Sequence, residues 1–250
     1  MKALILNSGM GSRMGKYTKD HPKCMTDLLD EETIISRQLK ILNAVGIDDI
    51  VITTGYFRDV LMEYCYSLDL PLKYTFIHNK YYNSTNYIYS IYCAKEQLKN
   101  QDIIMMHGDL VFEESVLRNL VAFQDSCMKV SSTLPLPEKD FKAVVQDGKV
   151  KKVGVEFFEN AMEAQALYKL NEPQWNLWLD KISEFCEADN RSCYAEKALN
   201  EITDNNRLFV VNRNTDGYTI VNQVKGTKNN AISLSDAWLK GYIGGLPNNF

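Results

Sequence analysis

The sequence has no excess of positive charge and few of the residues that interrupt a folded core. Its 28 Lys and Arg are outnumbered by 32 Asp and Glu, which leaves a formal charge of −4 over 250 residues. Such a chain has no general positive field to attract a nucleic acid backbone, so any polyanion that it binds must be small and held locally. With only 13 glycines and 6 prolines and 45% apolar residues, it is not a mainly disordered or fibrous protein.

Cysteine motifs and long apolar runs are also missing. The six cysteines are scattered without a C-x-x-C pair, and a chain of this length does not need a disulfide framework. The apolar start turns polar at Asn7, too early for a signal peptide, and no later stretch approaches the roughly 18 apolar residues of a membrane span. We therefore expect free thiols, a cytoplasmic location and no membrane contact.

Apolar runs alternate with amphipathic stretches along the chain. A buried run at 3–6 leads into a glycine-rich turn, and a helical pattern over 31–45 ends at Gly46 before a second apolar run at 50–53. This alternation predicts an α/β fold with a mixed, mostly parallel sheet flanked by helices. The expected strands are 3–6, 50–53, 72–77, 103–107, 128–134, 141–145, 150–155, 164–170, 208–211 and 218–221, and the expected helices are 31–45, 58–67, 87–98, 114–123, 174–186, 194–202 and 235–242.

The pattern changes at Pro135 and Pro137. Beyond them, Asp147-Gly148 between two apolar runs predicts a hairpin with a two-residue turn. The sequence shows no linker, repeat or low-complexity tract. We therefore expect a single domain over 1–250, in which 135–204 is an insertion into a body formed by 1–134 and 205–250.

The loop after the first strand carries the clearest chemistry. Its glycines let backbone N–H groups approach an anion, and Ser12 and Arg13 add a hydroxyl and a guanidinium for phosphate oxygens. The dinucleotide-binding fingerprint fails, because Met14 stands where the third glycine is required. The P-loop fails as well, because Lys16 is followed by Tyr17 and not by Ser or Thr. From the loop alone, a tight turn with nothing bound remains an equal alternative.

A longer motif separates these alternatives. The strand is followed by N-S-G-M-G-S-R-M, a polar spacer and His21-Pro22-Lys23. This combination resembles the signature of nucleotidyltransferases with a GT-A-like fold, which include sugar-phosphate nucleotidylyltransferases and phosphocholine cytidylyltransferases. The resemblance covers most of the first 125 residues. It implies that Arg13 and Lys23 stabilise charge on a triphosphate held by Leu6, Asn7, Ser8, Gly9, Gly11 and Ser12.

A carboxylate follows the strand at 103–107. Gly108 and Asp109 come where α/β sheets bind ligands, and one carboxylate with phosphates suits Mg²⁺. The resemblance makes Asp109 the metal ligand and a catalytic residue beside Arg13 and Lys23, with Gly108 at the nucleotide.

The family's second metal carboxylate, from an E-I-D triplet before the last helix, has no clear equivalent. The corresponding stretch is 231–236, and Asp236 is its sole acid. Three possibilities remain. The site is completed by Asp236 or by another acid, such as Glu196 or Asp216; the metal relies on Asp109 and phosphates alone; or catalysis is impaired.

The segment around residue 86 has two interpretations. Its polar head and apolar tail predict a helix capped by Ser84, Thr85 or Asn86. The resemblance to cytidylyltransferases adds that Asn86 and Ser90 contact the pyrimidine base.

For the acceptor, the sequence offers aromatic and charged residues within the insertion. Aromatic faces beside a carboxylate suit a cationic head, which nominates Trp175, Tyr194 and Glu196, with Lys169 as a partner for the acceptor phosphate. The helical spacing of Trp175, Trp178 and Ile182 equally predicts core packing, above all for Trp178.

Together these features predict a cytidylyltransferase that transfers CMP from CTP to a small phosphorylated or phosphonate acceptor with Mg²⁺. In this prediction the body binds the nucleotide and the insertion binds the acceptor. Phosphocholine, 2-aminoethylphosphonate and an amino-acid-derived phosphate remain open as acceptors. A sugar-1-phosphate nucleotidylyltransferase and a nucleotide-binding module without catalysis remain alternatives, and a homodimer is one of the open oligomeric states.

Overall fold

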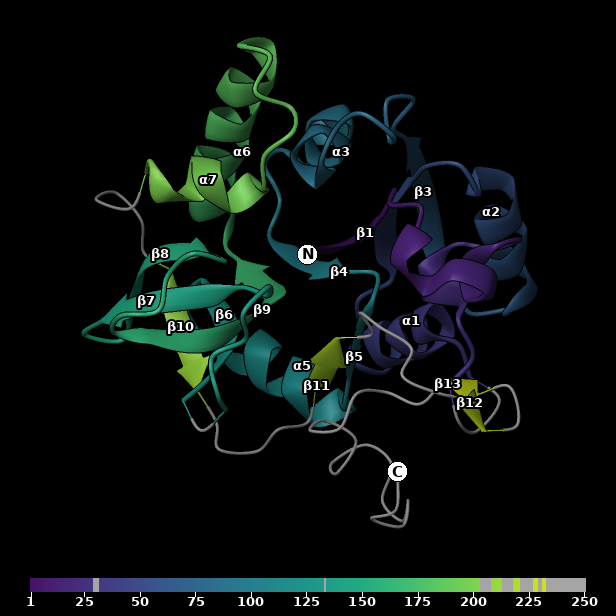
Figure 1. Cartoon of the computed structure of the whole chain (residues 1–250), viewed down its shortest axis with the longest axis horizontal. Helices are drawn as coiled ribbons and strands as arrows, with labels where there is room; N and C mark the ends of the chain where they lie inside the picture. Colours follow the sequence, from purple (N-terminus) through teal and green to yellow (C-terminus); the bar gives the residue numbers. More distant parts are fainter. Residues whose placement is uncertain are drawn as a thin grey trace.

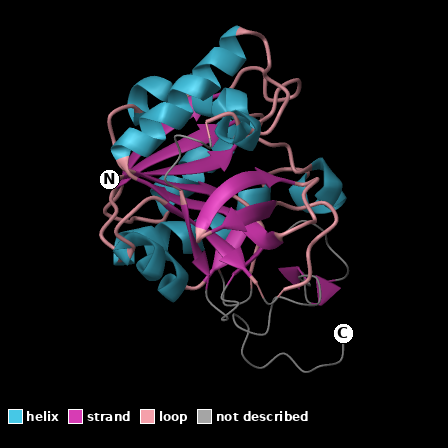
Figure 2. Cartoon of the chain, turned by 90° about the vertical axis from the view of Figure 1, so that its left-hand side faces the viewer, coloured by secondary structure: helices cyan, strands magenta, loops and turns pink. Residues whose placement is uncertain are grey.

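A computed structural model describes residues 1–28, 32–132, 134–202, 208–212, 218–220, 227–228 and 231–232 (Figure 1). Its main sheet has the strand order β3-β2-β1-β4-β9-β6-β10-β8-β7. Helices lie on both sides of these strands, as Figure 2 shows in cyan and magenta. The predicted α/β fold with a mixed sheet is confirmed.

The parallel part of the sheet comes from the first half of the chain. It consists of β3 (Lys73–His78), β2 (Asp49–Thr54), β1 (Lys2–Asn7) and β4 (Ile103–His107). In β1 the residues from Ala3 to Leu6 are buried, because helices cover both faces of this part of the sheet. The continuous apolar run in the sequence has this physical cause.

Two helical layers cover the sheet. On one face α1 (Ile34–Ala44), α2 (Arg58–Ser67) and α5 (Glu114–Ala122) share an apolar core with the alternate residues Ile5 and Ile52. On the other face α3 (Tyr87–Cys93), α4 (Lys95–Leu98), α6 (Glu172–Glu187) and α7 (Ala195–Asn200) pack against Leu4 and Val51. The period of two along a strand divides its side chains between these cores.

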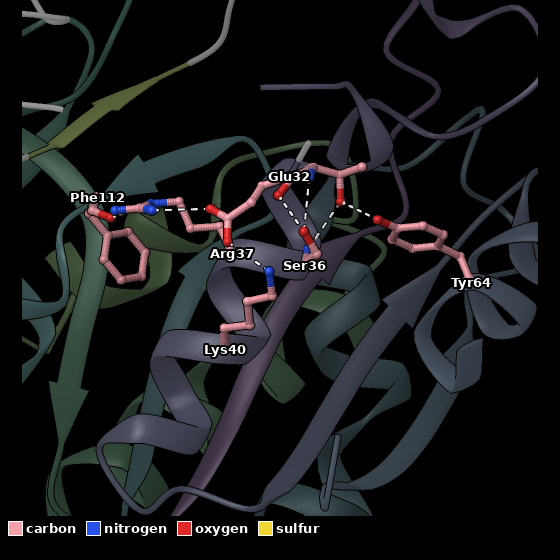
Figure 3. A network of polar contacts seen from close by, with 7 residues as sticks. Glu32, Ser36, Arg37, Lys40, Tyr64 and Phe112 are labelled. Carbon is pink, nitrogen blue, oxygen red and sulfur yellow. Dashed lines mark hydrogen bonds and ion pairs between the residues drawn. The ribbon is translucent and has the colours of Figure 1, made fainter. Parts of the chain in front are cut away.

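Helix α1 begins at Ile34, three residues later than predicted, because Thr33 caps it. The Ser36 N–H donates to Thr33 Oγ1 at 3.1 Å, and the Thr33 N–H donates to Ser36 Oγ at 2.9 Å. One turn later, Arg37 donates from Nε to the Phe112 carbonyl oxygen at 3.0 Å and pairs with Glu32 (Figure 3). These contacts tie α1 to the chain that follows β4.

The second half of the sheet is mainly antiparallel. Strand β9 (Ala161–Leu170) lies between β4 and β6 (Cys127–Ser131) and is antiparallel to both. Beyond β6 follow β10 (Phe209–Asn212), β8 (Lys149–Gly154) and β7 (Lys142–Gln146). The turn of the β7–β8 hairpin is Asp147-Gly148, with φ of 52° and 71°, which confirms the predicted two-residue turn.

Short elements complete the described chain. They are the 3₁₀ helices η1 (Ser12–Thr18) and η2 (Lys23–Met25), β5 (Leu110–Phe112) paired with β11 (Tyr218–Ile220), and β12 (Thr227–Lys228) paired with β13 (Ala231–Ile232). The helix predicted over 235–242 lies outside the described residues. Within the part that the structure describes, no helix has both the length and the apolar character to cross a membrane. All six cysteines are free thiols.

Candidate functional site

A cavity of about 380 Å³ opens at the carboxyl edge of the parallel strands. The residues that follow β1 and β4 line it, because the carboxyl ends of parallel strands meet at one edge of a sheet. The start of α3 and Tyr194, the residue before α7, line it as well. The lining includes these residues that the sequence assigns to the nucleotide: Leu6, Asn7, Ser8, Gly9, Gly11, Ser12, Lys23, Asn86, Ser90 and Gly108.

Two glycines allow neighbouring strand ends to approach the loop after β1. A Cβ atom at Gly108 would lie 1.6 Å from Asn7 Oδ1. A Cβ atom at Gly55, just beyond β2, would lie 2.2 Å from the carbonyl oxygen of Ser8. The Gly108 N–H donates to the Leu6 carbonyl oxygen at 3.1 Å. Both positions therefore require glycine for close approach, and the loop is held between the ends of β2 and β4.

Two polar atoms of this loop are buried without a partner. They are Asn7 Nδ2, a donor, and Ser8 Oγ, a donor or acceptor, and neither has a hydrogen bond within the described residues. Buried polar atoms are nearly always hydrogen-bonded, so each exception calls for an explanation, such as a role at a site or a water or ion that binds there. A group rich in acceptor oxygens, such as a phosphate, would satisfy both atoms.

Lys23 and Asp109 form an ion pair at the edge of the cavity. The distance from Lys23 Nζ to Asp109 Oδ2 is 2.8 Å, and the side chains are 15% and 24% exposed. Burial opposes ionisation of Asp109, but the Lys23 ammonium and then His107 outweigh it, so the pKa of the Asp109 carboxyl lies below its usual value. Asp109 is therefore a carboxylate at neutral pH, able to face a cation or an ammonium.

Helix α1 positions the loop that carries Asp109. The buried Gln38 side chain donates from Nε2 to the carbonyl oxygens of His107 at 2.9 Å and Leu110 at 2.7 Å. These two bonds bracket the residues between β4 and β5. Gln38 was not among the residues predicted for the site, although a glutamine within the apolar stripe of α1 was the available signal.

A second residue that sequence analysis missed is Asn79, which follows β3. Its Nδ2 donates to Thr85 Oγ1 and to Ser90 Oγ, both at 3.0 Å. Asn86 caps α3 by accepting from the Tyr87 N–H at 2.8 Å. Of the three caps that the sequence allowed, Ser84, Thr85 and Asn86, the structure has Asn86. A polar residue where a strand ends, as at Asn7, was the signal that could have found Asn79.

An aromatic group lies beside Asp109. The Tyr87 ring meets His107 edge-on at 4.7 Å between centroids, and Phe141 meets Tyr194 at 5.2 Å. Tyr87 and Tyr194 are 5.9 Å apart. Two further cavities adjoin this group and share Phe141 and Tyr194, one of about 120 Å³ and one of about 310 Å³. The predicted acceptor residue Tyr194 therefore lines all three cavities.

Glu196 borders the 310 Å³ cavity but is only 1% exposed. Its carboxylate accepts a hydrogen bond from the Tyr87 hydroxyl and another from the Tyr168 hydroxyl, the latter at 2.8 Å. Burial, and next the charge of Glu196, raise the pKa of Tyr87 well above its ordinary value. Glu196 thus holds the Tyr87 ring in the aromatic group.

Two of the predicted acceptor residues lie away from these cavities, which corrects the prediction. The Lys169 Nζ donates to the carbonyl oxygens of Phe123 and Gln124, the latter at 3.2 Å, near the far end of β9. Trp175 is fully buried in the core and donates from its indole to the Leu98 carbonyl oxygen at 2.9 Å. Trp178 is also fully buried, as its helical spacing predicted.

Three other predicted residues cannot be placed. The Arg13 side chain lies outside the described part of the chain, and so do Asp216 and Asp236. Among the described residues, no group of three or more His, Cys, Asp or Glu side chains is arranged to hold a metal ion. Asp109 as the ligand of Mg²⁺, an ion that commonly takes one or two carboxylates with phosphate and water oxygens, stays a prediction.

A comparison with protein families decides the family. A model described as a MobA-like NTP transferase domain matches residues 3–132. The chain belongs to the MobA-like NTP transferase family. The matched region contains β1 to β6, with the glycine loop, Lys23 and Asp109. The resemblance drawn from the N-terminal motif is thus confirmed.

Curated relatives of this chain include cytidylyltransferases. The CTP:phosphoglutamine cytidylyltransferase of Campylobacter jejuni is 34% identical over 126 residues, 48% of each chain. The choline-phosphate cytidylyltransferase of Streptococcus pneumoniae is 34% identical over 106 residues, 42% of this chain and 43% of the relative. The matches therefore span about half the length of these relatives, or less.

Solved structures share the fold of this chain over most of its length. The CTP:phosphocholine cytidylyltransferase from Streptococcus pneumoniae superimposes with a TM-score of 0.72 at 19% identity, covering 90% of this chain and 94% of that one. The inositol-1-phosphate CTP transferase from T. maritima gives a TM-score of 0.69 at 20% identity and covers 89% of each chain. At these identities the agreement concerns the fold alone.

Proposed function

We propose that this NTP transferase is a cytidylyltransferase that moves CMP from CTP to a small phosphorylated or phosphonate acceptor. The observation that carries the proposal is the continuity of the cavities. The 380 Å³ cavity, lined by the glycine loop, shares His107, Asp109 and Tyr194 with the 120 Å³ cavity. Two substrates would therefore meet at Asp109. The similarity to CTP-using relatives supports CTP as the donor.

The reaction is an in-line displacement at phosphorus. An anionic oxygen of the acceptor forms a bond to the α-phosphorus of CTP, the bond from that phosphorus to the bridging oxygen breaks, and pyrophosphate leaves with the electron pair. No proton has to move, because the attacking oxygen is already charged. The protein must therefore supply position and charge neutralisation.

The chain's own groups fit these tasks. The Asn7 amide and the Ser8 hydroxyl, both buried and unpartnered, would donate to phosphate oxygens. The Lys23 ammonium, 15% exposed beside the cavity, would neutralise triphosphate charge. Asp109 would hold Mg²⁺ together with phosphate oxygens, and the ion would supply charge neutralisation when bound. We assign Arg13 the same task as Lys23 from the motif.

The base and the acceptor would occupy the two ends of this arrangement. Asn86 and Ser90 line the 380 Å³ cavity on α3, where we place the cytosine. Tyr194 and Phe141 would form an aromatic wall for the acceptor head, held in place through Glu196 and Tyr87.

We also propose that the protein works in the cytoplasm without nucleic acid or membrane, and that 1–250 acts as one domain, as a monomer or homodimer.

Pyrophosphate release tests the proposal. Purified protein with Mg²⁺ and each of CTP, UTP, GTP and TTP is incubated with a panel of phosphoryl acceptors. We expect release with CTP and a small phosphorylated or phosphonate acceptor. Lys23→Ala and Asp109→Ala are expected to lower the rate by about a hundredfold or more, the scale of one preorganised charge contact. The exposed Lys19→Ala and Asp59→Ala make the same changes elsewhere and serve as controls.

Two outcomes would contradict the proposal. Release with UTP and a sugar-1-phosphate, but not with CTP, would make the chain a sugar-1-phosphate nucleotidylyltransferase. Binding of CTP without release from any acceptor would make it a nucleotide-binding module, an alternative that the missing acids in 231–236 favour.

A further inference from the structure

The 120 Å³ cavity contains an unexplained polar group, the side chain of Gln165. This cavity adjoins the candidate reaction centre, because His107 and Asp109 line it. The aromatic rings of Phe141 and Tyr194 also line it. Sequence analysis did not nominate Gln165, and nothing in the proposed reaction uses it.

The direction of β9 brings Gln165 to this position. Strand β9 runs antiparallel to β4, with Met106 paired to Leu167 and Ile103 paired to Leu170. Continuing this register places Gln165 beside the residues that follow β4, where Asp109 is found. Lys169, four residues further along the same strand, is about 13 Å away at 3.3 Å per residue. One strand therefore brings Gln165 to the candidate centre and carries Lys169 away from it.

The orientation of the Gln165 amide follows from its neighbour. Its Nε2 donates to the carboxyl group of the buried Glu163, two residues earlier on the same face of β9. The reverse orientation would direct the amide oxygen at the carboxylate oxygen, which accepts but does not donate. The amide nitrogen is therefore committed to Glu163.

The amide oxygen is left without a partner. Gln165 is only 4% exposed, and its Oε1 is buried with no hydrogen bond among the described residues. A buried acceptor without a donor costs free energy, and a ligand that donates a hydrogen bond to Oε1 would remove this cost. Asp109, Asp140 and Lys139 also line this cavity, and of these three Lys139 is the exposed one.

We infer that the 120 Å³ cavity receives the head of the acceptor and that Gln165 selects a primary ammonium there over a quaternary ammonium. An ammonium has N–H donors for Oε1 and a positive charge for the Asp140 carboxylate and the aromatic faces. A trimethylammonium has the charge but no donor, so its binding would leave Oε1 buried and unsatisfied. The inference rests on the proposed function and names the class of acceptor, a phosphorylated or phosphonate alkylamine.

Phosphoethanolamine and phosphocholine test this inference, because they differ only in three methyl groups on the nitrogen. We expect kcat/KM for phosphoethanolamine, measured by pyrophosphate release at saturating CTP, to exceed that for phosphocholine by about tenfold or more. Gln165→Met keeps the length of the side chain and removes the acceptor oxygen. In this variant the preference is expected to disappear, mainly through a rise in KM for phosphoethanolamine.

A matched control separates this effect from a general loss of structure. Gln146→Met makes the same chemical change at an exposed position of the β7–β8 hairpin and is expected to keep the wild-type preference. Binding of CTP, measured by calorimetry, is expected to be the same in both variants and in the wild type, because Gln165 does not line the 380 Å³ cavity.

The outcomes distinguish failure of the inference from failure of the proposed function. Equal turnover of the two amines, a preference that survives in Gln165→Met, or faster turnover of glycerol phosphate than of phosphoethanolamine would overturn the inference alone. The absence of pyrophosphate with every acceptor, despite CTP binding, would overturn the proposed function and the inference with it.

Discussion

Replacing Gly108 by alanine is expected to weaken CTP binding and the fold through one displaced side chain. The new Cβ would lie 1.6 Å from Asn7 Oδ1 and 2.4 Å from Asn7 Cγ. Unbonded carbon atoms prefer separations of about 3.5–4.0 Å, so the amide must move by roughly 2 Å. The backbone of Asn7 cannot follow easily, because its N–H donates to Thr53 Oγ1 at 3.2 Å.

The magnitude follows from this displacement. Overpacking of a dense site costs about 1–3 kcal/mol of unfolding free energy. Losing one hydrogen bond to a charged phosphate costs about 1.5–3 kcal/mol of binding, which is about a ten- to hundredfold rise in the Kd for CTP. Calorimetry gives the Kd, and urea denaturation gives the unfolding free energy.

Two further variants separate the causes. Gly148→Ala also strains the fold, by about 1–2 kcal/mol, because Gly148 has φ of 71°, but it lies in the β7–β8 turn and leaves the Kd unchanged. Adding Asn7→Ala to Gly108→Ala removes the overlapping atoms and is expected to recover stability but not CTP affinity. If the double variant stays as unstable as Gly108→Ala, or if Gly108→Ala binds CTP normally, the reasoning is wrong.

Other features give further predictions. Burial opposes ionisation of Glu32, but Lys40 and Arg37 outweigh it and lower the pKa of Glu32 below its ordinary value of 4.5. The ion pairs of Glu32 therefore add stability above pH 4.5, and this stability is lost as the pH falls through the lowered pKa. Urea denaturation of Glu32→Gln should show a smaller loss of stability between pH 6 and pH 3 than the wild type, and an equal loss would contradict this. Tyr194→Ala is expected to raise KM for the acceptor about tenfold, the scale of a lost aromatic contact with a cation. If steady-state kinetics give an unchanged KM for the acceptor, Tyr194 does not belong to the acceptor site. Lys169→Met is expected to leave KM for the acceptor unchanged, because the Lys169 ammonium donates to backbone carbonyl oxygens away from the cavities. A large rise in KM would support the prediction from the sequence that Lys169 binds the acceptor phosphate.

Local patterns predicted much of the fold, because local physics decides them. Helix α2 has the predicted bounds, 58–67, and β4 has the predicted bounds, 103–107. The turn at Asp147-Gly148 forms as expected, because these residue types tolerate positive φ. The glycine loop and Asp109 also meet in one cavity, because both follow strands that are parallel neighbours.

Long-range pairing could not be predicted in the same way. Nothing local to β9 indicates that it lies between β4 and β6, yet this placement decides that Gln165 borders the candidate centre and Lys169 does not. The spacing of Trp175 fitted both a cation-binding face and a core face, and only the packing of α6 against the sheet separates the two. Partnerless atoms such as Asn7 Nδ2 are visible only once neighbours are known.

The reversed course of β9 has a consequence for how the specificity of this protein could change. Strands parallel to β4 end at the edge of the sheet where the 380 Å³ cavity opens, whereas β9 is antiparallel to β4 and begins near that edge. A change near the start of β9 alters one wall of the 120 Å³ cavity without touching the glycine loop or Lys23, which come from the other end of the chain. Single replacements on this strand could therefore change which of the proposed acceptors is preferred, while the glycine loop and Lys23, the groups proposed to bind the triphosphate, stay unchanged.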